Sequence, residues 1–281
     1  MAEVPDLYRI VDALPTDRAR AFWELAAYKR RHEEVDWISA IRSSYSGPSA
    51  DFDTHCDRVL HAWQIYETNR FTVRSSSGAR DQMGMFPRAA RLNHSCSPNV
   101  FHRHNHRINR LTIHALKDIP AGAELCTSYI DIVHPTAERR RLLRHWGFKC
   151  GCTQCRSHSA SSELRRTKLE DAFSRVRRDA AARSQRSQIP KWDYARALDA
   201  LEAVLGLMAE EGLDETDTSA EVLGLAVDCA LALGWAGQAR DWAAQALEVE
   251  ARSLGEDSEE WQVARERLRE AEAAFSAQKE N

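Results

Sequence analysis

The spacing of hydrophobic positions changes along the chain and divides it into three zones. Residues 161–281 carry hydrophobic side chains at alternating steps of three and four, the period of a helix with one buried face. One such series is Tyr194, Leu198, Leu201, Leu205 and Met208, and another is Trp261, Ala264, Leu268, Ala271 and Phe275. Gly212, Gly234 and Gly255 separate the series, where glycine favours helix ends. This zone is predicted to be helical throughout.

The two preceding zones differ in the secondary structure that their residue patterns predict. Residues 4–69 carry helix signals, including Pro15-Thr16-Asp17 before an apolar stripe, and a face formed by Val59, Trp63 and Tyr66. Residues 70–156 instead contain short β-prone runs separated by turn residues, which predicts a β-rich domain rather than βαβ units. The expected strands are residues 71–73, 83–86, 111–116 and 124–130.

Composition narrows the class of protein. Of 281 residues, 43% are hydrophobic and 29% charged, which is typical of a folded globular chain. No run of about 18 apolar residues is present, so no membrane span is expected. The N-terminus is acidic and has no apolar segment of the kind that secretory signals need. We therefore expect an intracellular protein of the nucleus or cytoplasm, whose seven cysteines are metal ligands or core residues.

Charge is distributed in two blocks of opposite sign. Residues 137–191 hold 15 Lys/Arg and 5 Asp/Glu, whereas residues 192–281 hold 7 Lys/Arg and 21 Asp/Glu. A basic block can bind an acidic partner, but the Arg139-Arg140-Arg141 run has no interleaved aromatic residues, so direct nucleic-acid binding is not predicted. We favour the alternative that the two blocks face each other within the protein.

Three cysteines stand close together in a C-x-C-x-x-C run at Cys150, Cys152 and Cys155. Zinc prefers four tetrahedral sulfur or nitrogen ligands in a structural site, so this run predicts a metal site with a fourth ligand from elsewhere. The segment is too polar for three core residues, which is the other interpretation. The residues alone leave six candidates for the fourth ligand, namely Cys96, Cys126, Cys56, Cys229, His145 and His158.

Two further segments carry candidate chemistry. Residues 91–100, R-L-N-H-S-C-S-P-N-V, hold side chains that bond their own backbone and favour irregular turns. His102, His104 and His106 would share one face of an extended strand and could bind metal. We favour a solvated hairpin strand for these histidines.

The polar segment resembles the R-L-N-H-S-C-S-P-N motif of SET-domain lysine methyltransferases. The segment G-x-E-L-x-x-S-Y from Gly122 to Tyr129 and the run R-R-x-L-L-x-x-W-G-F-x-C-x-C-x-x-C from Arg139 to Cys155 resemble two further motifs of the same family, in the same order. Their spacing is similar to the SMYD-type branch and its fungal relatives, which add a helical TPR-like C-terminal domain. A plain helical bundle is the alternative for that domain.

The resemblance implies a role for each motif residue. Tyr129 would be the catalytic tyrosine, which orients the substrate amine and does not take its proton. Asn93 and His94 would contact S-adenosylmethionine, largely through the Asn93 side chain and backbone groups, and Phe148 would flank the adenine. Cys96 would complete a structural Zn²⁺ site with Cys150, Cys152 and Cys155. The alternative for Phe148 is ordinary packing against Trp146 and the zinc loop.

The implied fold class is α+β, with a β-rich SET core. The expected layout is a helical insert region over 1–69, the SET core over 70–135, a post-SET zinc segment over 136–160 and the TPR-like domain over 161–281. The implied function is S-adenosylmethionine-dependent methylation of lysine in a protein or peptide, such as a histone tail. The alternative is a catalytically inactive, zinc-stabilised SET-like module that binds proteins.

Two parts of the family pattern are not found before Phe71. Only one glycine, Gly47, and one cysteine, Cys56, occur there, so neither the G-x-G strand nor the MYND zinc module is recognisable. We therefore expect the chain to correspond to the family from the helical insert onward.

Overall fold

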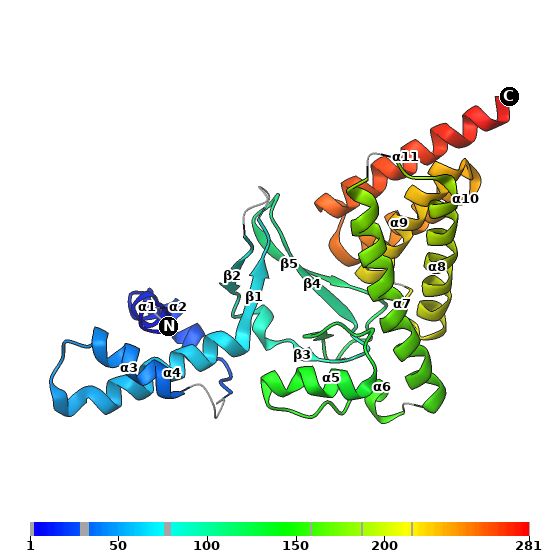
Figure 1. The fold of residues 1–281 in the computed structure, drawn as a ribbon. Helices are drawn as coiled ribbons and strands as arrows, with labels where there is room; N and C mark the ends of the chain where they lie inside the picture. The colour runs from blue at the N-terminus through cyan, green and yellow to red at the C-terminus, as the bar shows by residue number, and fades with distance from the viewer. Residues whose placement is uncertain are drawn as a thin grey trace. The chain divides into compact units, whose positions relative to one another are not determined.

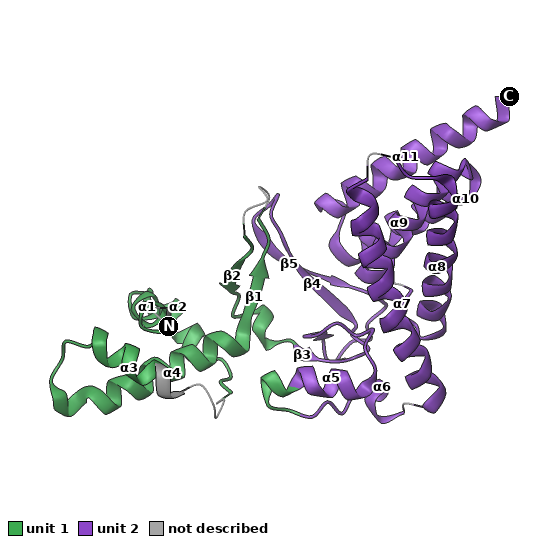
Figure 2. Cartoon of the chain, in the orientation of Figure 1, with its two compact units in different colours: residues 1–92, 144–148 green, residues 93–143, 149–281 purple. Residues whose placement is uncertain are grey.

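The computed structural model describes residues 3–28, 34–75, 80–157, 159–186, 188–214 and 216–280. The chain folds as two compact units (Figure 2). Unit 1 comprises Met1–Leu92 and Arg144–Phe148, and unit 2 comprises Asn93–Leu143 and Lys149–Asn281. The fold is therefore of mixed α and β type, with small sheets and a helical C-terminal region (Figure 1).

Unit 1 is mainly helical, as the hydrophobic pattern predicts. Its helices are α1 (Glu3–Asp12), α2 (Thr16–Trp23), α3 (Glu34–Ser44) and α4 (Phe52–Asn69). Helix α4 buries Val59 on one side, where it meets Val4 and Ile41, and Ile65 on another, where it meets Val11 and Phe22. Helix α2 stops at Trp23, so two members of the predicted apolar stripe of Phe22, Leu25 and Ala26 lie beyond the end of the helix.

A hairpin and a returning segment complete unit 1. Strand β1 (Arg70–Val73) follows α4 directly and pairs antiparallel with β2 (Gln82–Met85). The Trp146 indole N–H donates to the Thr68 carbonyl at 3.0 Å, and the His145 ring donates to the Glu67 carbonyl at 3.2 Å. These two bonds attach residues 144–148 to the C-terminal end of α4.

The strands of unit 2 form two small sheets. Strands β4 (Val100–Asn105) and β5 (Arg110–Ala115) form an antiparallel hairpin, and β3 (Asn93–His94) pairs parallel with β6 (Cys126–Thr127). The predicted strand over residues 124–130 is thus reduced to two residues. The Ser128 hydroxyl bonds with the backbone of Ile130, and this local turn competes with further pairing.

The histidines of β4 differ from the prediction. The strand itself forms as expected, but His104 is buried and His102 half-buried, so the face is not solvated. His106 lies beyond the end of the strand, and its Nε2 is 3.4 Å from Glu259 Oε2.

The helical zone of unit 2 confirms the periodic pattern. Helices α8 (Lys191–Glu210), α9 (Asp217–Leu233), α10 (Ala236–Leu254) and α11 (Glu259–Glu280) follow α5 (Thr136–Leu143), α6 (Thr153–Arg156) and α7 (Ala160–Ser184). Leu201, Met208 and Val222 are fully buried in their common core. Helix α10 also contacts both strands of the β4–β5 hairpin.

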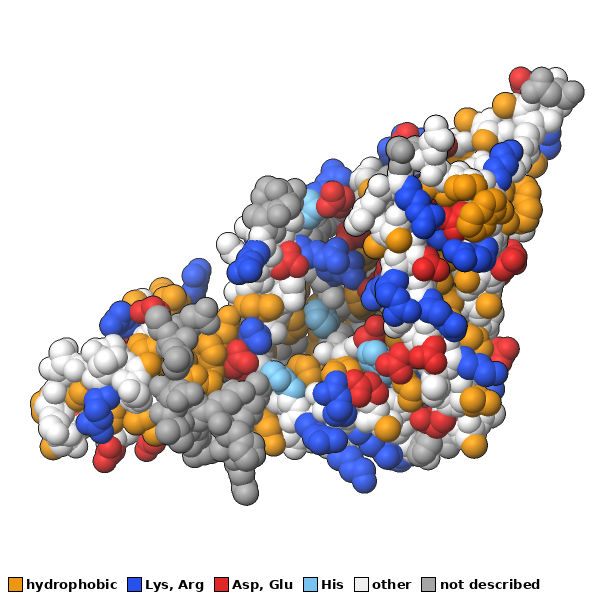
Figure 3. Space-filling model, in the orientation of Figure 1, with side chains coloured by type: hydrophobic (Ala, Val, Ile, Leu, Met, Phe, Trp, Pro, Cys, Tyr) orange, Lys and Arg blue, Asp and Glu red, His pale blue; other side chains and the backbone are white. Residues whose placement is uncertain are grey.

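The two charge blocks face each other, as favoured from the sequence. Arg165 and Arg166 of α7 both bond Glu211, and Arg177 bonds Glu221 of α9 at 2.6 Å. Figure 3 shows basic and acidic side chains interspersed over these helices. Four arginines of the basic block, including Arg186 with Asp193, thus form ion pairs with the acidic block inside unit 2.

None of the described helices combines the length and apolarity required to cross a bilayer.

Candidate functional site

The polar motif segment and the Tyr129 segment lie side by side through the β3–β6 pairing. Asn93 is opposite Cys126 and His94 is opposite Thr127 in the parallel register. One further backbone bond extends the contact, from the Ser95 N–H to the Thr127 carbonyl at 2.8 Å. The pairing thereby places residues more than 30 positions apart in sequence on adjacent strands, which are about 4.8 Å apart.

Asn99 forms three hydrogen bonds with the backbone of the segment that leads to Tyr129. Its amide Nδ2 donates to the Glu124 carbonyl at 2.8 Å, and its Oδ1 accepts from the Cys126 N–H at 2.8 Å. Its own N–H donates to the Cys126 carbonyl at 3.1 Å. Sequence reasoning assigned Asn99 no role of its own, although the turn-forming character of its segment pointed to side-chain bonds with backbone.

His94 links the two motifs through its ring. The Tyr129 backbone N–H donates to His94 Nδ1 at 3.1 Å, so Nδ1 accepts and the proton of the neutral ring sits on Nε2. Nε2 is 3.3 Å from the Cys96 sulfur, which places a donor toward that thiol. Burial, with a smaller contribution from Arg139, lowers the pKa of His94 to about 4, which keeps the ring neutral at pH 7.

Tyr129 is half-buried beside this ring, with the two ring centroids 5.4 Å apart. Burial raises the pKa of the Tyr129 phenol, and the neighbouring Cys126 and Glu124 act in the same direction. The phenol is therefore neutral at physiological pH and is suited to donate or accept a hydrogen bond, not to act as a base.

The remaining predicted cofactor residues lie in different units. Asn93 is exposed in unit 2, and its Nδ2 donates to Glu124 Oε1 at 2.6 Å. The β3–β6 pair thus presents an exposed amide and an exposed carboxylate that bond each other. Phe148 belongs to unit 1 and is 38% exposed.

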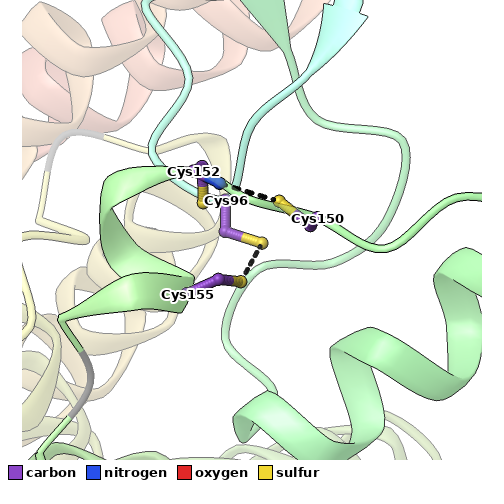
Figure 4. Close-up of side chains that lie close together, drawn as sticks. All are labelled: Cys96, Cys150, Cys152 and Cys155. Carbon is purple, nitrogen blue, oxygen red and sulfur yellow. Dashed lines mark hydrogen bonds between the residues drawn. The ribbon is translucent and has the colours of Figure 1, made fainter.

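The four cysteines of the predicted metal site lie together in unit 2 (Figure 4). The sulfur atoms of Cys96, Cys150, Cys152 and Cys155 are all within 4.8 Å of one another. Those of Cys96 and Cys155 are 3.6 Å apart. A tetrahedral zinc with bonds of about 2.3 Å separates its sulfur ligands by about 3.8 Å, so the spacing fits this metal.

The donor chemistry fits as well. Burial raises the pKa of Cys96, and it raises that of Cys150 to about 11. At Cys152 burial acts in the same direction, but hydrogen bonds from the backbone N–H groups of Cys155 and Cys96 and from neighbouring thiols outweigh it and lower the pKa to about 7. Three buried thiols and one half-buried thiol favour a cation that stabilises all four as thiolates.

The other candidates for the fourth ligand lie elsewhere. Cys56 is in the helical core of unit 1, Cys229 is in the helical core of unit 2, and His145 belongs to unit 1. Cys126 is outside the group, and His158 lies outside the described residues. Among the described residues this is the one cluster of metal-ligand type, so the histidines of β4 do not form a second one.

A comparison with protein families agrees with this geometry. Residues 19–130 match the family model of the SET domain, a range that contains β3, β6 and Tyr129. The chain carries a SET domain. The cysteine run from Cys150 to Cys155 lies after the matched range of the SET domain.

Three relatives illustrate the similarity of this SET domain to named enzymes. Histone-lysine N-methyltransferase set5 of Schizosaccharomyces pombe is 40% identical over 123 residues, which cover 42% of this chain and 37% of the relative. N-lysine methyltransferase SMYD2-B of Danio rerio is 37% identical over 123 residues, 43% of this chain and 27% of the relative.

Histone-lysine N-methyltransferase SMYD3 of Homo sapiens is 26% identical over 256 residues, which cover 86% of this chain and 58% of the relative. A match of this extent reaches into the helical C-terminal region. The chain thus spans less than two thirds of the length of each of these three relatives.

Proposed function

We propose that this chain is an S-adenosylmethionine-dependent protein-lysine methyltransferase of the SET type. The observation that carries the proposal is the β3–β6 pairing, in which His94 accepts from the Tyr129 backbone N–H and the exposed Asn93 lies opposite Cys126. The relatives named above, which are called lysine methyltransferases, support the same reaction. A lysine in a protein or peptide, such as a histone tail, is the proposed substrate.

Each residue has a stated role in the proposal. S-adenosylmethionine supplies a methyl group on a positively charged sulfur. Asn93 and backbone groups at His94 bind its amino-acid end, and Phe148 flanks its adenine. The Tyr129 phenol, kept neutral by burial, orients the substrate amine by a hydrogen bond while the lysine proton leaves to water. Cys96, Cys150, Cys152 and Cys155 hold a structural Zn²⁺.

The proposed layout keeps the sequence-based boundaries. Residues 1–69 form the helical insert region, 70–135 the SET core, 136–160 the post-SET zinc segment and 161–281 a TPR-like helical domain. Contacts between consecutive helices, from α8 to α9, α9 to α10 and α10 to α11, support a stacked array for the last of these.

The test begins with calorimetric titration of S-adenosylmethionine into zinc-replete protein. Saturable one-site binding is expected, followed by transfer of labelled methyl groups to lysine peptides and histones. Tyr129→Phe should bind the cofactor within a few-fold of the wild type but lose about 100-fold in transfer rate, since it removes the orienting hydroxyl.

Tyr194→Phe on α8 is the matched control, because it deletes the same hydroxyl from a helix outside the site. It should transfer methyl groups at the wild-type rate. Folded, zinc-loaded protein that binds no S-adenosylmethionine would contradict the proposal and would favour a non-catalytic binding module.

A further inference from the structure

Unit 1 brings a tyrosine from the N-terminal part of the chain onto the backbone just before Phe148. Residues 144–148 belong to unit 1, whereas the residues on both sides of them belong to unit 2 (Figure 2). Tyr28, which follows the buried Leu25, lies against Gly147 in that segment. Tyr28 and Phe148 are each 38% exposed, so part of each ring is accessible to a ligand.

The contact between Tyr28 and Gly147 is too close for any side chain at position 147. A Cβ atom there would overlap the Tyr28 ring, at 2.5 Å from Cζ and closer still to Cε2 and Cδ2. Gly147 also has a φ of +75°, in the left-handed region that favours glycine. The ring carbons of Tyr28 therefore lie directly on the Gly147 backbone.

The last turn of α4 holds both partners of this contact. The Tyr28 N–H donates to the Thr68 hydroxyl at 3.1 Å, and the buried Asn69 side chain donates to the Ala26 carbonyl at 2.7 Å. On the other side, the Thr68 carbonyl accepts from the Trp146 indole N–H at 3.0 Å. Thr68 thus bonds to the tyrosine and to the residue before Gly147, so α4 determines the spacing between them.

This contact restricts a flexible position beside a proposed ligand contact. Glycine has more backbone freedom than any other residue, and Tyr28 covers one side of Gly147. The next residue is Phe148, which is proposed above to flank the adenine. An aromatic ring gains most from a neighbouring ring in a limited set of orientations, so a change in the Gly147 backbone would lower affinity at Phe148.

We propose that Tyr28 is a positioning residue for the adenine end of the cofactor site. Its ring holds the Gly147 backbone, and thereby Phe148, in the orientation that stacks on a purine. The inference rests on the proposed function, because it takes S-adenosylmethionine as the ligand. It adds a residue that none of the three sequence motifs contains, since Tyr28 lies far before the first of them.

The experiment measures cofactor binding in variants of the full, zinc-replete chain. Tyr28→Ala removes the ring, Tyr28→Phe keeps the contacting carbons, and Gly147→Ala adds a methyl group where the ring lies. Tyr45→Ala is the matched control, because Tyr45 also covers a glycine of unit 1, with a Cβ at Gly47 2.6 Å from its Cζ, but in the α3–α4 connection. Calorimetry gives the dissociation constant of S-adenosylmethionine, and steady-state methyl transfer to a lysine peptide gives kcat and both KM values.

Tyr28→Ala should raise the dissociation constant and the KM of S-adenosylmethionine about tenfold, as expected for the loss of one aromatic contact. The kcat and the KM of the peptide should stay within about twofold, because Tyr129 is unchanged. Tyr28→Phe and Tyr45→Ala should bind the cofactor within about twofold of the wild type. A purely structural role would instead reduce the folded fraction, and so lower kcat at an unchanged KM.

A double variant tests whether the two residues act through one contact. Gly147→Ala should weaken binding about tenfold or more, because its methyl group overlaps the Tyr28 ring and its φ is unfavourable for alanine. Removal of the ring makes room for the methyl group. Tyr28→Ala with Gly147→Ala should therefore bind no more weakly than Gly147→Ala alone, whereas independent effects would multiply to about 100-fold.

Three results would overturn the inference and leave the proposed function intact: wild-type binding by Tyr28→Ala, an equal loss in Tyr28→Phe, or multiplied effects in the double variant. If Tyr28→Ala does not fold, Tyr28→Leu takes its place with the same expected loss. Failure of both to fold would show a structural role and overturn the inference as well. Folded wild-type protein that binds no S-adenosylmethionine would refute the proposed function, and this inference with it.

Discussion

The site segments of unit 2 and its C-terminal helices are stabilised in different ways. Strands β3 and β6 have two residues each and are joined by individual polar contacts, such as those of Asn99 and His94. Helices α8–α10 instead share a continuous apolar core with fully buried residues such as Leu201 and Val222. Loss of one polar group should therefore disorder much of the β3 and β6 segments, because no other contact replaces it. Loss of one apolar group should only lower the stability of helices α8–α10, because many other apolar contacts remain.

The sharpest test of this difference removes one cysteine. Cys96→Ser should abolish zinc binding, because Cys96 connects the β3 segment to the cysteines that follow α5. Hydrogen exchange measured by mass spectrometry should then accelerate by at least about tenfold in residues 93–100 and 124–134, while α8–α10 keep their protection.

Leu201→Ala is the matched change in the helical core. It should cost about 2–5 kcal/mol of unfolding free energy in a urea titration and leave the zinc content at the wild-type value. Global loss of protection in Cys96→Ser would contradict the comparison, because the helices would then depend on the metal.

A second test uses the pH dependence of the hairpin region. His102 on β4 has its Nδ1 2.7 Å from the Thr127 hydroxyl, and burial, followed by Arg103, lowers its pKa to about 4. Since the ordinary value is near 6.5, the unfolded chain binds the proton first as pH falls, and stability is lost between about pH 6.5 and 4. The expected loss from this group between pH 7 and 5 is about 2 kcal/mol.

His102→Gln should remove that part of the pH dependence. Urea unfolding of zinc-replete protein at pH 7 and at pH 5 should give a smaller difference for the variant than for the wild type. Equal differences would show that the folded ring takes up its proton as easily as the unfolded one.

The contrast between the two regions also explains what the sequence could predict. Periodic apolar positions such as Leu198 and Leu201 define helices locally, and the helical zone follows from them. The cysteine run predicted three members of the cluster by residue type, and the resemblance to the SET-domain motif added Cys96. The burial of Arg139 could not be read from a run of three arginines, because burial depends on how α5 packs after folding. The short length of β6 likewise depends on the Ser128 turn, which competes with pairing.

The smallest expected effect concerns the paired charge blocks. Arg177 and Glu221 bond at 2.6 Å, but their side chains are 51% and 42% exposed, so solvent and salt screen the pair. Arg177→Gln should change the unfolding free energy by no more than about 1 kcal/mol at low salt, and by less in 0.5 M NaCl, a salt level at which the Debye length is about 4 Å. The double variant Arg177→Gln with Glu221→Gln closes the cycle and isolates the pairwise coupling. A coupling energy that stays the same at both salt levels would mean that the pair is shielded from solvent. The charge blocks would then contribute more to the stability of the helical region than its apolar pattern indicates.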